Sequence, residues 1–225
     1  MAYRQTSFAE DEWFHCYTRS IDRKTVFQNI SDYQRFLEAL YLCNSDRPIQ
    51  RSSHYKLSYG DFLHLERGAP FVAIGGYCLM PNHFHLLIQE IVPGGISKFM
   101  QKVGTSFSMY FNAKYQHIGN VFVTPFRAKH IDDDTYLQRV IQYIHLNPLE
   151  LFEPDWKQGR INDLPSSKKK VEQYPYSSLS DYTNGKNRVE KNILNGTAME
   201  LFTTLPSFSD VIDDAIEYYA ELPIL

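Results

Sequence analysis

Two histidines separated by one residue, His83 and His85, are the most chemically suggestive feature of this sequence. They lie in the run His83–Gln89, whose composition is typical of a β-strand. Residues i and i+2 of a strand point to the same face of a sheet, so the two imidazoles are expected to stand side by side. Neighbouring neutral imidazoles bind a divalent metal ion well. The pattern alone does not distinguish a metal site from two ordinary strand histidines.

A second group of reactive side chains lies on an expected helix that follows Asp134 and runs to about Asn147. Aspartates in the first turn favour the helix start, and Pro148 disfavours helical geometry in the residue before it. At ~100° per residue, Tyr143 and Asn147 lie along the edge of the apolar stripe. The amide oxygen of Asn147 could therefore reach a metal ion near the phenol. The alternative is a boundary tyrosine and an Asn that ends the helix.

Together these side chains predict the attack of a tyrosine on a phosphodiester. Tyrosine is a poor nucleophile at its unperturbed pKa of ~10, so charge on the non-bridging oxygens must be neutralised. Mg²⁺ or Mn²⁺ held by His83, His85 and Asn147 would do this. Tyr136 is an alternative nucleophile, but it lacks an Asn four residues later. Gln89 shares the strand face of the histidines and is an alternative ligand.

The motifs around these residues resemble those of a known family. His83-Phe-His85 follows Leu-Met-Pro-Asn, and Tyr143-Ile-His-Leu-Asn147-Pro148 lies downstream. This combination resembles the motifs of the single-tyrosine HUH transposases, also called IS200-like transposases. Within that group it most resembles the REP-associated tyrosine transposase branch. The resemblance spans roughly residues 13 to 182, and it includes three further motifs: Phe14-His15 with Arg19, Gly119-Asn-Val-Phe122 with Phe126-Arg127, and Pro175-Tyr-Ser-Ser178.

The resemblance implies a fold, a site and a substrate. The fold would be an α+β ferredoxin-like sandwich, with an antiparallel sheet that carries the HxH motif and helices on one face. His83, His85 and Asn147 would bind Mg²⁺ or Mn²⁺, and Tyr143 would be the catalytic nucleophile. The partner would be single-stranded DNA with hairpin-forming repeats, cut to give a 5′-phosphotyrosine and a free 3′-hydroxyl. A homodimer is expected, and a monomer remains an alternative.

The charge is unevenly distributed along the chain, although the net charge is only −3. No Asp or Glu occurs from Ile91 to Ile131, whereas the sequence after Lys191 contains acidic residues and no basic ones. Phosphate binding requires local positive potential and not a positive total. The residues expected to contact DNA are Lys98, Lys102, Arg127, Lys129 and Arg19.

The 225 residues suggest a catalytic domain at 1–185 and an acidic, partly helical C-terminal extension at 186–225. A last helix is expected near Phe208 to Leu222, and residues 150–185 are expected to be irregular. There, Lys168 to Lys170 would lie in a solvated loop. Three widely spaced cysteines and the lack of an apolar span indicate a cytoplasmic protein with no membrane partner.

Several other features define the alternatives. Ser31 or Asp32 is expected to cap a helix, and strands are expected at Trp13–Thr18 and Phe71–Met80. A packed strand position is the expected state of His15, and the alternative is that His15 approaches the site from a neighbouring strand. The competing functions are a regulatory protein that binds DNA hairpins without turnover, and a phosphoesterase that uses activated water in place of the tyrosine.

Overall fold

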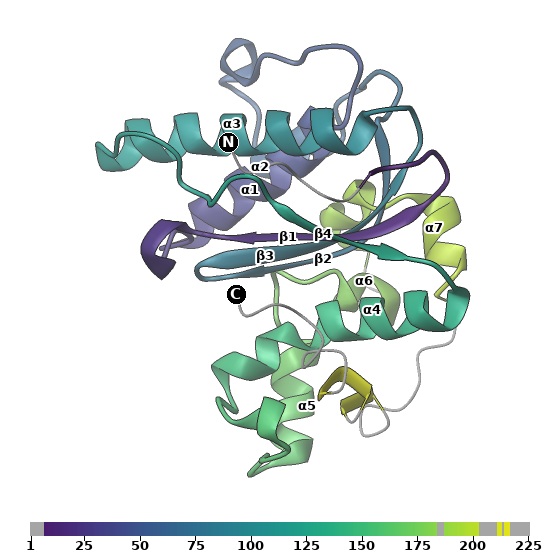
Figure 1. The fold of residues 1–225 in the computed structure, drawn as a ribbon. Coiled ribbons are helices and arrows are strands. Elements are labelled where there is room, and N and C mark those ends of the chain that lie inside the picture. The colour runs from purple at the N-terminus through teal and green to yellow at the C-terminus, as the bar shows by residue number, and fades with distance from the viewer. Residues whose placement is uncertain (1–6, 184–186, 203–210, 213, 217–225) are drawn as a thin grey trace.

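The fold is built on a four-stranded antiparallel sheet with the strand order β2-β3-β1-β4 (Figure 1). The computed structural model describes residues 7–183, 187–202, 211–212 and 214–216. The strands are β1 (Trp13–Arg19), β2 (Val72–Met80), β3 (His83–Glu90) and β4 (Arg127–Ile131). With a helix after β1 and another after β3, this is the β-α-β-β-α-β arrangement of a ferredoxin-like fold. The expected fold class is confirmed.

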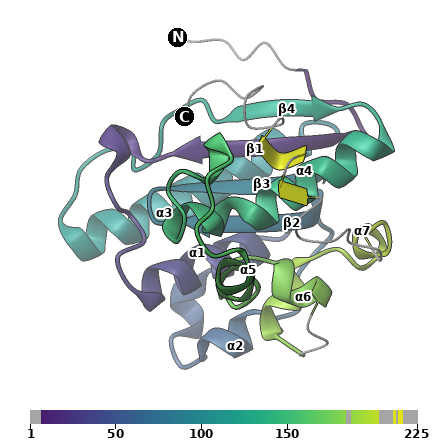
Figure 2. The ribbon, with the colours of Figure 1, turned by 90° about the horizontal axis from the view of Figure 1, so that it is seen from below.

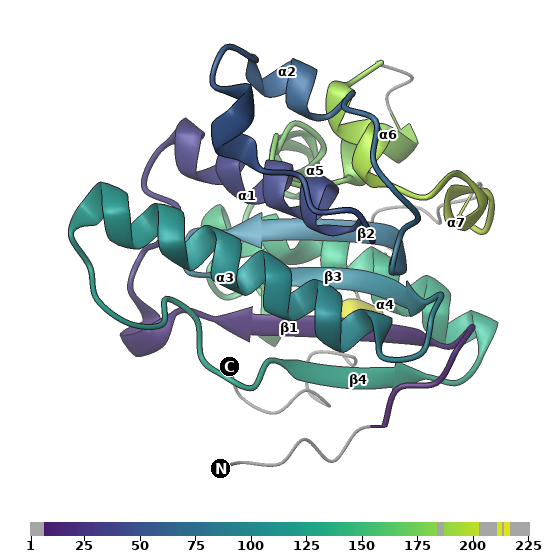
Figure 3. The same ribbon diagram turned by 90° about the horizontal axis from the view of Figure 1, so that it is seen from above.

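Helices cover both faces of the sheet, so the expectation of helices on one face is wrong in that detail. Helices α1 (Ile30–Cys43) and α3 (Gly95–Tyr115) cover one face (Figure 3), and α4 (Asp134–Leu146) covers the other (Figure 2). The reason lies in the strands, because both of their faces are apolar. In β3, Phe84 belongs to the core under α1 and α3, whereas Leu87 belongs to the core under α4. Two apolar faces require two covering layers.

Local sequence explains where the main elements begin and turn. The pairing of Met80 with His83 leaves Pro81-Asn82 as the two-residue connection of the β2–β3 hairpin, as expected. Helix α1 begins after Asn29, and the carboxylate of Asp32 accepts a hydrogen bond from the Asn29 backbone at 3.1 Å. The cap is therefore Asn29, not Ser31 or Asp32, because Asp32 occupies the third helical position of a capping box.

Helix α4 starts as expected, but the helical path does not stop at Asn147. The Asp133 side chain accepts a hydrogen bond from the Tyr136 backbone at 2.8 Å. After Leu146 the chain continues as a 3₁₀ helix, η3 (Asn147–Leu151). Pro148 stands in the first turn of η3, where its missing N–H costs nothing.

Of residues 150–185, the described part, 150–183, contains several helices, which corrects the expectation of irregular structure. They contain η4 (Trp156–Gln158), α5 (Leu164–Glu172) and α6 (Leu179–Thr183). Asp163 caps α5 by accepting from the Ser166 backbone at 3.0 Å. The lysines 168–170 lie in α5, of which Val171 is one of only two buried residues. With only two buried residues, this short helix shows no clear hydrophobic periodicity in the sequence.

The described part of the segment after residue 186 packs against both cores. It contains η5 (Val189–Ile193) and α7 (Gly196–Glu200). Ile193 belongs to the core under α1 and α3, and Phe202 belongs to the core under α4. The expected helix near Phe208 to Leu222 is helical at residues 211–212 and 214–216, and its remainder lies outside the described residues. The division at 185/186 stays a prediction.

Short helices complete the part of the chain that the structure describes. They are η1 (Ile21–Arg23), η2 (Arg51–His54) and α2 (Tyr59–Phe62). Among the described residues, no helix combines the length and the hydropathy that a bilayer crossing requires.

Replacement of Phe202 by Ala tests whether the C-terminal segment belongs to the folded core. The ring is 1% exposed and packs edge-on against Trp13 and Tyr182. We expect Phe202→Ala to lower the free energy of unfolding by about 3–5 kcal/mol, measured by urea denaturation. The neighbouring Leu201→Ala is the control, because Leu201 is 49% exposed. Equal stabilities of the two variants would show that the segment is not part of the core.

Candidate active site

The register of β1 against β3 gathers the predicted histidines with a basic residue on one face. Arg19 pairs with His83, and Tyr17 pairs with His85. Directly opposite residues of antiparallel strands have side chains on the same side of the sheet. By strand alternation His15 shares this face, which is the one that α4 covers. The expectation that His83 and His85 share a face follows from the same alternation.

Helix α4 holds Tyr143 against these histidines. The Tyr143 ring centroid lies 5.5 Å from that of His85 and 5.7 Å from that of His15, and both contacts are edge-on. Tyr143 is fully buried. The helix approaches β2 closely at Gly76, where a Cβ atom would lie 2.1 Å from Cδ1 of Ile141. A residue without a side chain at this position lets α4 sit low on the sheet.

The hydrogen bonds of His83 define which of its nitrogens carries the proton. Asn82 donates through Nδ2 to the carbonyl of Arg23 at 3.2 Å. Its Oδ1 atom therefore faces Nδ1 of His83, 2.7 Å away. An amide oxygen only accepts, so His83 donates from Nδ1 and keeps a lone pair on Nε2. His83 itself is half-buried.

Two potential metal-ligand atoms in the site are buried without a hydrogen-bond partner among the described residues. They are Nε2 of His85 and Oδ1 of Asn147. The amide nitrogen of Asn147 donates to the Tyr143 carbonyl at 2.9 Å, which leaves the oxygen as the open end of that side chain. Buried polar atoms normally have partners, so an amide oxygen and an imidazole nitrogen without partners indicate a missing binding partner such as a cation.

Burial keeps the histidines of the site neutral. Desolvation lowers the pKa of His83 to about 4, and the nearby Lys157 lowers it further against the opposing effect of Glu150. Desolvation lowers the pKa of His15 to about 3, with Lys129 acting in the same direction. The pKa of His85 lies well below its ordinary value, because of burial and the neighbouring imidazoles. Neutral imidazole is the form that ligates metals.

These residues fit a divalent metal ion. His83 and His85 each offer Nε2, and Asn147 offers Oδ1. Within the described ranges, no three His, Cys, Asp or Glu side chains converge as a ligand cluster. A metal site here must therefore include the amide oxygen of Asn147, water or a substrate oxygen. Mg²⁺ prefers oxygen ligands, whereas Mn²⁺ accepts both imidazole and oxygen ligands. A mixed set of two imidazoles and an amide oxygen therefore suits Mn²⁺ better than Mg²⁺.

Three of the five basic residues expected to contact DNA lie on this face. Arg127 pairs with Tyr17 and Lys129 pairs with His15, so both point to the same side as the histidines. The third is Arg19, whose Nη1 atom is buried without a hydrogen-bond partner among the described residues. A partly desolvated guanidinium beside His83 is well suited to bind a phosphate oxygen.

The other two predicted basic residues lie on the opposite face. Lys98 and Lys102 belong to α3, and their ammonium groups lie 4.4 and 4.9 Å from the centroid of the Phe71 ring. Lys102 also donates to the backbone carbonyl of Ser45 at 2.8 Å. The structure therefore does not bring these lysines to the histidines, and a phosphate contact there stays a prediction.

One charged pair near the site was not found from the sequence. Lys157 in η4 and Glu150 in η3 form an ion pair at 2.6 Å, and both influence the pKa of His83. No motif or spacing signals this pair, because the short helices that carry it have no periodic pattern. The Lys157 side chain is only 13% exposed.

His145, to which the sequence analysis assigned no role, anchors the end of α4. Its Nε2 lies 2.8 Å from Oγ of Ser178, and that hydroxyl also accepts from the Tyr77 backbone at 2.9 Å. Ser178 thereby joins α4 to β2. The Pro175–Ser178 motif as a whole runs along β2, with a bridge between Ser177 and Cys78. This motif therefore holds the helix that carries Tyr143.

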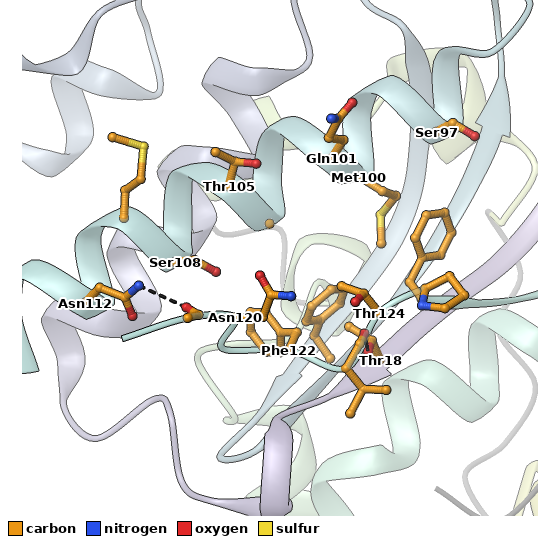
Figure 4. A pocket seen from close by; sticks show the side chains of 17 residues that line it. Thr18, Ser97, Met100, Gln101, Thr105, Ser108, Asn112, Asn120, Phe122 and Thr124 are labelled. Atoms are coloured by element: carbon orange, nitrogen blue, oxygen red, sulfur yellow. Dashed lines mark hydrogen bonds between the residues drawn. The ribbon is translucent and has the colours of Figure 1, made fainter. Parts of the chain in front are cut away.

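A cavity of about 650 Å³ lies on the other face, between α3 and the segment before β4 (Figure 4). Its polar lining comes from uncharged side chains such as Gln101 and Asn120 (Figure 4). Phe84 and Phe122 add aromatic surface. Because the lining contains no charged residue, this cavity lacks the groups that phosphoryl chemistry requires.

Comparisons with known proteins agree with this geometry. Residues 68–147 match the family model described as "Transposase IS200 like". This range extends from β2 to the end of α4 and includes His83, His85, Tyr143 and Asn147. The chain is thus similar, over its central segment, to a family of DNA-processing enzymes.

The fold is also similar to that in a solved structure described as "Structure of the REP associates tyrosine transposase bound to a REP hairpin". The TM-score is 0.54, with 16% identity over 84% of this chain and 90% of that one. No curated protein sequence matches the chain significantly. The family model confirms the resemblance to IS200-like transposases, and the solved structure confirms the fold.

Substitution of Ser178 tests the anchoring of α4. Ser178→Ala leaves the Tyr77 backbone N–H and the His145 ring without their buried partner. We expect a loss of about 1–3 kcal/mol in the free energy of unfolding, measured by urea denaturation. The matched control is Ser53→Ala, at an exposed position. Hydrogen exchange should also speed up in α4, and unchanged exchange there would contradict the anchoring role.

Proposed function

We propose that this protein is a metal-dependent tyrosine DNA transesterase, a transposase that cuts single-stranded DNA beside a hairpin. The observation that carries this proposal is the packing of Tyr143 against His85, next to two orphaned acceptors on His85 and Asn147. The proposed nucleophile and two of the proposed metal-ligand atoms thus belong to the same buried cluster. The family match supports DNA as the substrate.

The basic residues of the site would bind and orient the DNA backbone. Arg19 can donate from Nη1 to a phosphate oxygen, and Arg127 and Lys129 extend the positive charge along the same face. Charge-assisted hydrogen bonds of this kind fix the position of a phosphate. The scissile phosphate would then lie between Arg19 and the ring of Tyr143.

The reaction exchanges one phosphate ester bond for another. The Tyr143 oxygen forms a bond to phosphorus, and the bond from phosphorus to the 3′ oxygen breaks. The phenol loses its proton, and the departing 3′ oxygen gains one. A divalent ion held by His83, His85 and Asn147 would supply neutralisation of the non-bridging oxygens. Burial of Tyr143 protects the resulting phosphotyrosine from hydrolysis, so that a 3′-hydroxyl can reseal the strand.

The partner that we propose is a hairpin-forming single strand. The related solved structure is described as bound to a REP hairpin, and this supports a hairpin ligand for the present chain. We propose a cytoplasmic protein that acts as a homodimer or a monomer, with catalysis in residues 1–185. A hairpin-binding regulator without turnover is the main alternative, and the experiment below separates the two.

Covalent capture of cut DNA is the direct test. Labelled hairpin oligonucleotides from the DNA flanking the gene are incubated with the protein and Mg²⁺ or Mn²⁺, then run on a denaturing gel. We expect a protein-linked band that disappears on chelation and in Tyr143→Phe. Tyr136→Phe is the matched control, because Tyr136 is on the same helix but lies under the ammonium of Lys129. This control variant should retain the band.

Each contrary outcome selects an alternative function. Tight hairpin binding without any covalent band would favour the regulatory protein. Metal-dependent cleavage that persists in Tyr143→Phe, but not in His83→Ala, would favour a phosphoesterase that uses water. A band that requires Tyr136 would make Tyr136 the nucleophile without changing the class of the reaction.

The salt dependence of binding tests which face of the sheet contacts DNA. Each lost phosphate contact should reduce the slope of log K against log salt by about 0.7 for single strands. We expect this reduction in Arg19→Gln and in Lys129→Gln. Lys98→Gln and Lys102→Gln, on the opposite face, should keep the wild-type slope. A lower slope in the α3 variants alone would place the DNA over α3 instead.

A further inference from the structure

The two proposed ligand histidines are each held by a hydrogen bond at Nδ1. Asn82 lies 2.7 Å from Nδ1 of His83, and Nε2 of His15 lies 2.8 Å from Nδ1 of His85. The first contact has only one proton arrangement, because the Asn82 oxygen cannot donate. The second joins two imidazoles, and either ring could in principle be the donor.

The surroundings of His85 decide between the two arrangements. If His15 donated, the proton of neutral His85 would be on Nε2, as a buried N–H with no acceptor among the described residues. If His85 donates from Nδ1, its Nε2 carries a lone pair instead. A metal ion satisfies a lone pair, whereas no described residue of the site accepts a hydrogen bond from an N–H at this position. His85 would then have the same proton arrangement as His83.

His15 is itself held firmly enough to act as a fixed acceptor. It lies in the middle of β1 and is fully buried. Its ring stacks on that of His85, with centroids 5.0 Å apart and planes 25° apart, and it contacts the Tyr143 ring edge-on. Its full burial disfavours the charged imidazolium, so the ring is neutral and can accept.

We propose that His15 is a positioning residue, which accepts the Nδ1 proton of His85 and thereby directs the Nε2 lone pair of His85 toward the divalent ion. This inference rests on the proposed function, because it assigns a role in the same metal site. His15 does not touch the ion or the DNA in this role. Such partners typically contribute a factor of about 10–100 to metal affinity.

Two substitutions separate hydrogen bonding from packing. His15→Phe keeps an aromatic ring in the strand but removes the acceptor, whereas His15→Gln retains an amide oxygen near the position of Nε2. Mn²⁺ binding to the full-length protein without DNA is measured by calorimetry. We expect affinity about 10- to 100-fold weaker in His15→Phe, with most of it restored in His15→Gln. Tyr17→Phe is the control, because the Tyr17 ring also stacks on His85 but the substitution removes only a hydroxyl and keeps the hydrogen bond between His15 and His85.

A second measurement needs no metal, and its decisive part uses only the wild-type protein. The ¹⁵N chemical shifts of His85 in the metal-free wild-type protein report which nitrogen is protonated. We expect the proton on Nδ1, and a mixture of tautomers in His15→Phe. A proton on Nε2 in the wild type would overturn the proposal, as would equal Mn²⁺ affinity in wild type and His15→Phe. If the wild type binds no Mn²⁺, the proposed function fails, and the tautomer result alone decides the role of His15.

Discussion

The register of the antiparallel sheet is the constraint on which the rest of the structure depends. Side chains alternate between faces along each strand, so a slip of one residue would exchange the two faces. The two-residue connection at Pro81-Asn82 sets β3 against β2, and the pairing of Arg19 with His83 sets β1 against β3. In this register the imidazoles and guanidinium groups share one face, while Phe84 and its neighbours build the core under α3.

Burial has two effects in the site, and both follow from the position of α4. The helix encloses the histidines, which lowers their pKa values and keeps them neutral. It also places the phenol of Tyr143 in the same desolvated space. The low position of the helix depends on Gly76, and its end depends on the contact between His145 and Ser178. Residues outside the proposed catalytic and metal-ligand set thus decide how closely Tyr143 approaches the histidines.

The placement of these side chains relative to one another could be predicted, because it follows from the regular side-chain spacing within one strand and within one helix. Strand alternation places His83 and His85 together, and helical spacing places Asn147 one turn after Tyr143. The outcome for Lys98 and Lys102 could not be predicted in this way. Their spacing shows that they share a helix face, but it does not show which side of the sheet the helix covers. The position of Lys157 near His83 could not be predicted either, because only the tertiary fold brings η4 close to this histidine.

The contact between residues 174–178 and β2 has a consequence for the behaviour of the protein in solution. The backbone of Leu79 donates to the carbonyl of Tyr176 at 2.9 Å, and Ser178 donates to the carbonyl of Tyr77 at 3.0 Å. These bonds occupy the outer edge of a strand that is buried along its whole length and rich in apolar residues. An open edge of this kind would template the addition of strands from other molecules. Residues 174–178 therefore cover this edge and oppose aggregation. Shortened chains that lack them would aggregate, so their catalytic activity could not be measured.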